Sequence, residues 1–133
     1  MTLATETRLS HAKAMAVLPA EDLERARRFW GETLGFKIEP DPQGGAQFIV
    51  HAGAGTSFLV YERARTVAEH TAATFIVDDL DATVSELRAH GIEFAEYDMP
   101  GLKTVDGIAT LGSERSAWFT DPEGNIIAVA SMN

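Results

Sequence analysis

Histidine is the side chain in this sequence best suited to metal binding or acid–base chemistry, because the chain contains no cysteine. The four histidines are His11, His51, His70 and His90, and they are widely separated along the chain. His90 precedes Gly91 at the end of a predicted helix, where the negative end of the helix dipole suits an imidazole. His51 precedes a glycine-rich turn, and we expect it to be exposed. His11 and His70 are therefore the two candidates for a metal site.

Other catalytic motifs are not evident in the sequence. There is no nucleophile elbow, phosphate-binding loop or cofactor fingerprint. The glycine-rich stretches "GGAQ" and "GAGT" lie between predicted strands, which favours hairpin turns. The lack of cysteine excludes disulfides and thiolate metal sites, and it favours a cytoplasmic location.

Composition and charge narrow the class of protein. The 133 residues are 45% hydrophobic and 23% charged, which is typical of a globular domain. No apolar run is long enough to span a bilayer, and the N-terminus lacks a secretory pattern. The net charge of −9 disfavours nucleic acid and anionic membranes as partners. The acidity suits a cationic ligand, although solubility alone explains it equally well.

The elements that would position a site occur twice. The first half predicts a strand over 14–19, a helix over 21–34, and strands over 36–40, 46–52 and 56–62. The second half predicts a strand over 72–77, a helix over 78–90, and strands over 92–97, 117–120 and 125–131.

The two halves have matching landmarks. The helix-start residues Asp22 and Asp79 are 57 positions apart, and the capping glycines Gly35 and Gly91 are 56 apart. In the first helix the apolar residues recur every three or four positions, so we expect Trp30 to be a core residue. The sequence therefore predicts a doubled βαβββ unit.

Three stretches of the sequence are distinctive: "LPAEDLERARRFWGETLGF", "FIVDDLDATVSELRAHGIEF" and "WFTDPEGNII". Together they resemble the vicinal oxygen chelate superfamily, which contains glyoxalases, bleomycin-resistance proteins and extradiol dioxygenases. The resemblance implies an α+β fold with two βαβββ modules, a curved mixed sheet, helices on its outer face and a concave cavity. It also implies a homodimer. We expect an N-terminal arm over 1–12 and one domain over 13–133, with modules over about 13–62 and 70–133.

The resemblance also indicates where a metal would be held. Enzymes of the superfamily use His or Glu from the first and last strands of each module. These places map to Met15, Leu59, Ala72 and Ala128. None of the four is a ligand for a divalent ion, so no metal or other cofactor is expected. One alternative stays open, in which His11 or His70 forms a displaced metal site. The other interpretation is that both histidines lie near solvent, where strands begin.

Strand alternation predicts the residues that share the concave face with these four places. Trp118 and Phe119 must point to opposite sides of their strand, and Trp118 is preferred as a stacking surface. Tyr97 and the polar loop over 98–116 are interpreted as a lid. The expected ligand-binding residues are Met15, Leu59, Tyr61, Ala72, Thr74, Tyr97, Trp118 and Ala128.

These features favour a metal-free protein that binds a small organic molecule, with a cationic ligand as one option. The first alternative is a lyase, isomerase or dioxygenase that uses a non-standard metal or acid–base site. The second is a module whose sheet face serves protein association only. One scaffold hosts many functions, so the fold does not name the ligand.

Overall fold

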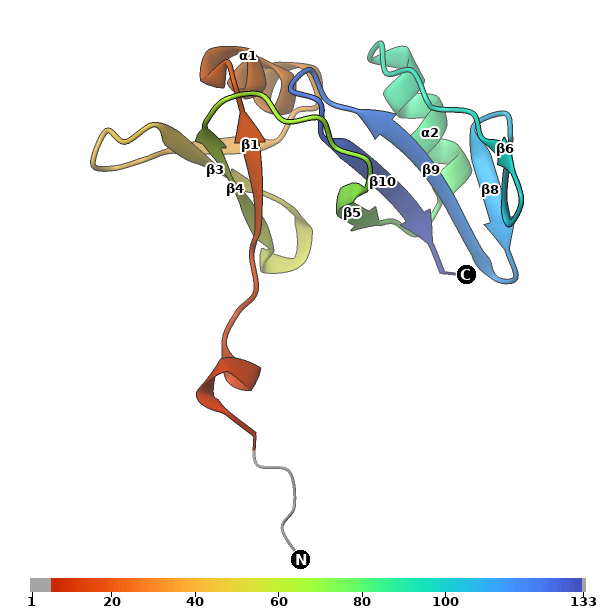
Figure 1. The fold of residues 1–133 in the computed structure, drawn as a ribbon, viewed down its shortest axis with the longest axis horizontal. Helices are drawn as coiled ribbons and strands as arrows, with labels where there is room; N and C mark the ends of the chain where they lie inside the picture. The colour runs from red at the N-terminus through yellow and green to blue at the C-terminus, as the bar shows by residue number, and fades with distance from the viewer. Residues whose placement is uncertain (1–5, 133) are drawn as a thin grey trace, which may run out of the picture.

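The computed structural model describes residues 6–132; residues 1–5 of the predicted arm and residue 133 lie outside the described part. The described part of the arm contains a short 3₁₀ helix, η1 (Arg8–His11), none of whose residues is buried. The arm extends away from the rest of the chain (Figure 1).

The first module contains β1 (Ala16–Ala20), β2 (Lys37–Pro40), β3 (Gln47–His51) and β4 (Ser57–Glu62). These strands form one sheet in the order β1-β4-β3-β2, and β1 runs parallel to β4. The helix α1 (Leu23–Arg27) continues as a π-helical segment, η2 (Arg28–Thr33). A 3₁₀ turn, η3 (Gly53–Gly55), joins β3 to β4.

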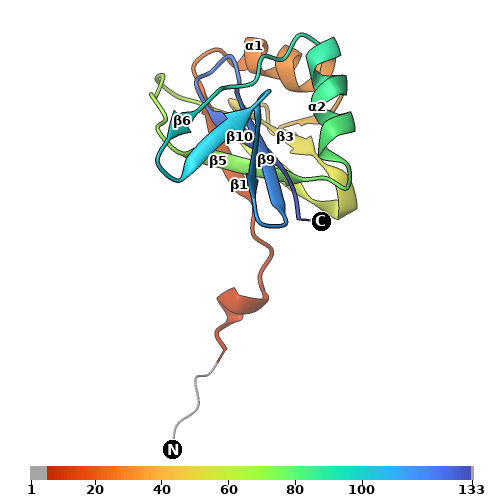
Figure 2. The ribbon, with the colours of Figure 1, turned by 90° about the vertical axis from the view of Figure 1, so that its right-hand side faces the viewer.

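The second module begins with β5 (Thr71–Ile76) and α2 (Leu80–Ala89). Five strands follow, and the sheet order is β5-β10-β9-β8-β7-β6, with β5 parallel to β10. Both helices lie on one side of the strands (Figure 2). The predicted α+β fold of βαβββ-like modules is therefore confirmed, with the strands divided between two mixed sheets. The five strands are β6 (Asp98–Met99), β7 (Leu102–Val105), β8 (Ile108–Leu111), β9 (Glu114–Thr120) and β10 (Ile126–Ser131).

Two predictions for the second module are wrong. Residues 92–97 form no assigned strand, although the Ala95 amide donates to the Trp118 carbonyl at 2.8 Å. The segment over 98–116 is not an irregular loop, because it folds into β6, β7, β8 and the start of β9. Backbone polar groups need partners when buried, and tight turns allow this segment to pair with itself. Gly107, at φ +82°, supplies one such turn.

The helix boundaries agree with the predicted landmarks. Asp22 and Asp79 accept hydrogen bonds from the backbone amides of Arg25 and Ala82, each at 3.0 Å. These bonds satisfy amides that have no partner within the helix. Each module therefore begins its helix with the same aspartate cap.

An aromatic cluster joins the two modules. Trp30, only 1% exposed, packs its ring against Phe58 of the first sheet at 4.9 Å between centroids. Its ring also lies 6.1 Å from that of Phe75 on the second sheet. The two modules consequently share one hydrophobic core, and Trp30 is a core residue as predicted.

Candidate functional site

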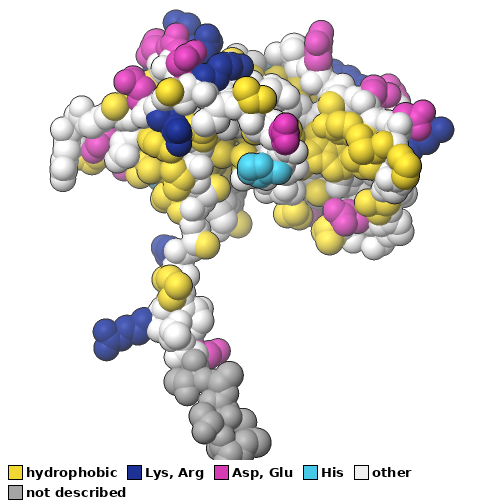
Figure 3. All heavy atoms as spheres, in the orientation of Figure 1, with side chains coloured by type: hydrophobic (Ala, Val, Ile, Leu, Met, Phe, Trp, Pro, Cys, Tyr) yellow, Lys and Arg dark blue, Asp and Glu magenta, His cyan; other side chains and the backbone are white. Residues whose placement is uncertain are grey.

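Each sheet has one face that the helices do not cover. On β1, Leu18 is 1% exposed and lies in the core, whereas its neighbour Val17 is 52% exposed. The same alternation continues along β3 and β4. We call the uncovered sides the open faces. Hydrophobic side chains gather over both sheets on the side shown in Figure 3.

The open face of the first sheet has an apolar centre. Val17 on β1 is in register with Leu59 on β4, and Leu59 is in register with Ile49 on β3. Tyr61 lies two residues beyond Leu59 on the same face, and half-exposed Met15 precedes β1. The expected residues Met15, Leu59 and Tyr61 therefore belong to one surface.

The open face of the second sheet has a floor of small residues beside an aromatic pair. Ala128 on β10 lies between Trp118 on β9 and Thr74 on β5. Ala128 and Ala130 are buried without joining the main core cluster. The Tyr97 ring meets the Trp118 ring edge-to-face, with centroids 5.6 Å apart.

Phe119 points to the opposite side from Trp118. Its ring packs against Phe29 at 6.4 Å and Phe94 at 5.9 Å, and only 3% of it is exposed. The preferred orientation, with Trp118 on the open face, agrees with this geometry.

The structure does not gather the eight expected residues on one surface. Met15 precedes β1, and Leu59 and Tyr61 lie on the first sheet. Thr74, Trp118 and Ala128 lie on the second sheet, with Tyr97 against Trp118, whereas Ala72 packs against the core cluster. A hollow of about 500 Å³ lies between β1, the η3 turn and β5, and Thr74 is the one expected residue that lines it. Ser57 of the first sheet and Ile76 of the second also line it, so this hollow is shared between the two sheets.

The metal-binding places of the superfamily do not fit a divalent ion in this chain. Met15, Leu59, Ala72 and Ala128 present a thioether and hydrocarbon groups, whereas such ions bind imidazole, carboxylate or thiolate. Across residues 6–132, no three His, Cys, Asp or Glu side chains are grouped in a way that could hold a metal ion.

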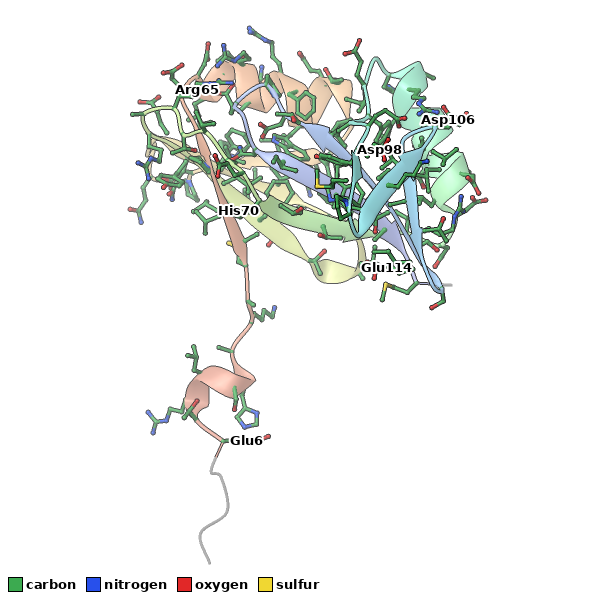
Figure 4. The ribbon with its side chains drawn as sticks, turned by 45° about the vertical axis from the view of Figure 1, so that its right-hand side comes forward. Glu6, Arg65, His70, Asp98, Asp106 and Glu114 are labelled. Atoms are coloured by element: carbon green, nitrogen blue, oxygen red, sulfur yellow. The ribbon has the colours of Figure 1, made fainter. Side chains whose placement is uncertain are left out.

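The displaced two-histidine site is not assembled either. His11 lies on the arm, where its Nε2 is 3.0 Å from Glu6 Oε2. Figure 4 shows Glu6 far from His70, which lies beside the sheets just before β5. The arm therefore holds His11 away from the surface that carries His70.

The sequence analysis did not identify a polar pair on the first open face. His51 Nε2 on β3 lies 2.7 Å from Glu39 Oε1 on β2, and both side chains are partly exposed. In the β2–β3 and β3–β4 registers, His51 is opposite Lys37 on one side and Ser57 on the other. Alternation could have placed His51 on this face, since it lies two residues after Ile49.

A separate hollow of about 1000 Å³ lies beside the start of α1 and the turn between β2 and β3. It contains none of the expected residues. Its lining includes Glu21, Asp22, Glu24, Asp41 and Glu62, together with Arg25 and Arg27. Arg27 is paired with Glu24, and Arg25 with Glu123. Acidic side chains therefore surround this hollow, away from the open faces.

Comparison with known proteins defines the class. Residues 8–129 match the glyoxalase/bleomycin resistance protein/dioxygenase superfamily. This match covers most of the chain, and the chain belongs to this superfamily. The Bacillus subtilis protein YetH, which is itself uncharacterized, is 28% identical over 81 residues, covering 56% of this chain and 68% of YetH.

Solved structures share the fold at low sequence identity. A glyoxalase/bleomycin resistance protein from Streptomyces sp. CB03234 is 27% identical, with a TM-score of 0.62 over 89% of this chain and 98% of that one. TnmS3, an antibiotic binding protein from the same organism, is 23% identical, with a TM-score of 0.62 over 90% and 96%. A glyoxalase/dioxygenase from Nostoc punctiforme is 16% identical, with a TM-score of 0.67 over 98% of both chains. Structural neighbours therefore include both a binding protein and an enzyme-type family member.

No helix among residues 6–132 is long and apolar enough to cross a membrane.

Proposed function

We propose that this chain binds a small organic molecule on its open faces and does so without a metal ion. The observation that carries the proposal is the chemistry of these faces. Val17, Leu59 and Ile49 form an apolar surface on the first sheet, and Trp118 with Tyr97 borders a small-residue floor on the second. Ligand sites are typically apolar with a few polar anchors.

The comparison with TnmS3 supports a binding role. TnmS3 is described as an antibiotic binding protein and has the same fold. A binding role needs no metal, and the side chains at the superfamily's four metal places suit an apolar ligand better than a divalent ion.

A second copy of the chain is the proposed cover for the open faces. Large apolar side chains are exposed there, including Val17 at 52% and Ile76 at 66%. Contiguous exposed apolar surface marks interaction sites in soluble proteins. A homodimer that buries these faces would enclose a ligand and remove the apolar surface from water.

A second candidate function is an enzyme that uses acid–base groups. The paired His51 and Glu39 favour it, because an imidazole oriented by a carboxylate is a common general base. Binding alone is the leading proposal because no grouped metal ligands accompany this pair among residues 6–132.

Native mass spectrometry of protein purified without chelator tests the proposal. We expect a dimer mass, with either no added mass or the mass of an organic ligand, and no stoichiometric divalent ion. A thermal-shift screen of apolar organic compounds should then find molecules that raise Tm, because a ligand of the folded state stabilises it. A tightly held divalent ion at one per chain would contradict the metal-free proposal.

A further inference from the structure

The pair formed by His51 and Glu39 leaves one imidazole nitrogen available. Glu39 Oε1 lies 2.7 Å from His51 Nε2. A carboxylate only accepts hydrogen bonds, so Nε2 carries the proton. In the neutral ring the other nitrogen, Nδ1, then has a free lone pair and can accept a proton. The contact with Glu39 therefore orients a base on the open face.

A cation lies next to this base. Lys37 on β2 is directly opposite His51 in the strand register, and within residues 6–132 it forms no ion pair. Glu39 is already engaged with His51. Tyr61 lies on the same sheet face, and its hydroxyl accepts a 3.5 Å hydrogen bond from Arg63. An anionic oxygen beside His51 would thus have Lys37 as a counter-charge.

Apolar surface adjoins these polar groups. Ile49 is opposite Glu39 on the neighbouring strand, and Leu59 and Val17 continue the same row across the sheet. A planar apolar ligand lying on Ile49 and Leu59 could place a polar substituent at His51. The site combines a hydrocarbon platform, a base and a cation.

We propose that His51 is a proton-accepting anchor for the phenolic hydroxyl of an otherwise apolar aromatic ligand. The ligand O–H bond breaks and an N–H bond forms at Nδ1, while the electron pair stays on the phenolate oxygen. Glu39 stabilises the resulting imidazolium, and Lys37 stabilises the phenolate. This inference rests on the proposed function and specifies the ligand class for the same face. It differs from the cationic ligand that the net charge of −9 suggests, because local charges rather than the average determine binding at a site.

4-Nitrophenol is a suitable probe, because its phenolate has a distinct long-wavelength absorption band. The probe is titrated with full-length protein at a pH below its own pKa, where most of it is protonated in buffer. The wild-type protein should bind it and increase the phenolate band. 4-Nitroanisole, which has a methyl group in place of the acidic proton, reports binding to the apolar surface alone.

Three variants separate the roles of His51, Lys37 and Glu39, and a fourth variant serves as a control. His51→Gln should abolish the increase in phenolate and weaken 4-nitrophenol binding by about tenfold or more, the effect of losing a charged hydrogen bond. Lys37→Met and Glu39→Gln should each reduce the phenolate fraction while leaving 4-nitroanisole binding unchanged. His90→Gln, at the end of α2, should behave as wild type. Thermal melts confirm that each variant folds.

Each outcome bears on the inference. Loss of the phenolate band in His51→Gln, with 4-nitroanisole binding retained, supports the anchor. Equal phenolate formation in wild type and His51→Gln overturns it. The inference is also overturned if the protein binds 4-nitrophenol in its protonated form, or if it does not bind 4-nitrophenol at all. Failure of the anchor leaves 4-nitroanisole binding and the native mass spectra intact, whereas failure of the proposed function appears in those two measurements.

Discussion

Glu123, in the turn between β9 and β10, forms an ion pair with Arg25 on α1 through its buried carboxylate. The same carboxylate accepts hydrogen bonds from the backbone amides of Glu21 and Asp22, at 2.8 and 3.0 Å. Asn125 adds a bond from Nδ2 to the Pro19 carbonyl at 3.0 Å. The last turn of the second module therefore caps the first helix of the first module.

Replacing Glu123 with Gln should destabilise the fold by about 1–3 kcal/mol at neutral pH, since charge-assisted hydrogen bonds to a buried group are lost. Burial alone would raise the pKa of Glu123, but the bonds from Arg25, Asp22 and Glu21 outweigh it and leave the pKa below its ordinary value of 4.5. Urea denaturation at pH 7 measures the change. The matched variant Glu86→Gln, on the exposed side of α2, should have little effect.

The lowered pKa also predicts an acid dependence. The unfolded chain binds a proton at Glu123 more readily than the folded chain does, so this stabilisation is complete above pH 4.5 and is lost as pH falls through the folded pKa. Burial raises the pKa of Asp121 despite its hydrogen bonds, so protonation of Asp121 favours the fold as pH falls and acts in the opposite direction. Glu123→Gln should therefore lose less stability between pH 5 and pH 3 than wild type does. A steeper loss in the variant would contradict this assignment.

The two aspartate caps should be equivalent. Asp22→Ala and Asp79→Ala each remove a bond to a first-turn amide, and each should cost about 1 kcal/mol of the free energy of unfolding. Denaturant titrations of both variants and of Asp22→Asn and Asp79→Asn check this, because asparagine keeps the cap. A large cost for only one of the two alanine variants would show that the caps are not equivalent.

Substitutions of the two tryptophans should have different effects, with Trp30 important mainly for stability and Trp118 mainly for ligand binding. Trp30→Ala removes a fully buried side chain and should cost about 3–5 kcal/mol. Trp118→Ala removes a half-buried side chain from the open face and should cost on the order of 1 kcal/mol, while weakening ligands found in the thermal-shift screen. If Trp118→Ala binds those ligands as wild type does, Trp118 is not part of the binding surface.

If the open faces form a dimer interface, a charge introduced on one of them should weaken dimerisation. Val17→Lys, on the open face of the first sheet, should shift sedimentation from dimer to monomer, because burying an unpaired ammonium in an apolar interface is costly. Val67→Lys changes a valine that is 88% exposed in the segment between the modules and should leave the dimer intact. A wild-type protein that sediments as a monomer at high concentration would disprove the dimer.

Local signals predicted most of the fold. The caps at Asp22 and Asp79 and the positive φ angles of Gly35 and Gly91 follow from the residues alone. Strand alternation also predicts the position of Leu59 on the uncovered face. The glycines and charged residues over 98–116 suggest a loop, whereas the strands that form there pair along the neighbouring edge of β9.

The candidate site was less predictable. Alternation along β10 indicates which side of the strand Ala128 faces, but it does not indicate its neighbours. Ala128 lies beside Trp118 because β9 and β10 pair in this register. The contact between His51 and Glu39 joins strands that are separated in sequence by a turn, so neither residue is conspicuous by itself. Side-chain pairs of this kind depend on tertiary geometry, which periodicity does not contain.

The exposed segment between β4 and β5 has a practical consequence. It carries Val67 at 88% exposure, whereas the halves on either side bury Trp30 and Phe75 against each other. Cleavage after Val67 should therefore yield two fragments that stay associated and can be separated only by denaturant. Mixed again, they should reassemble with a yield that depends on concentration, which makes the chain a natural scaffold for a split reporter.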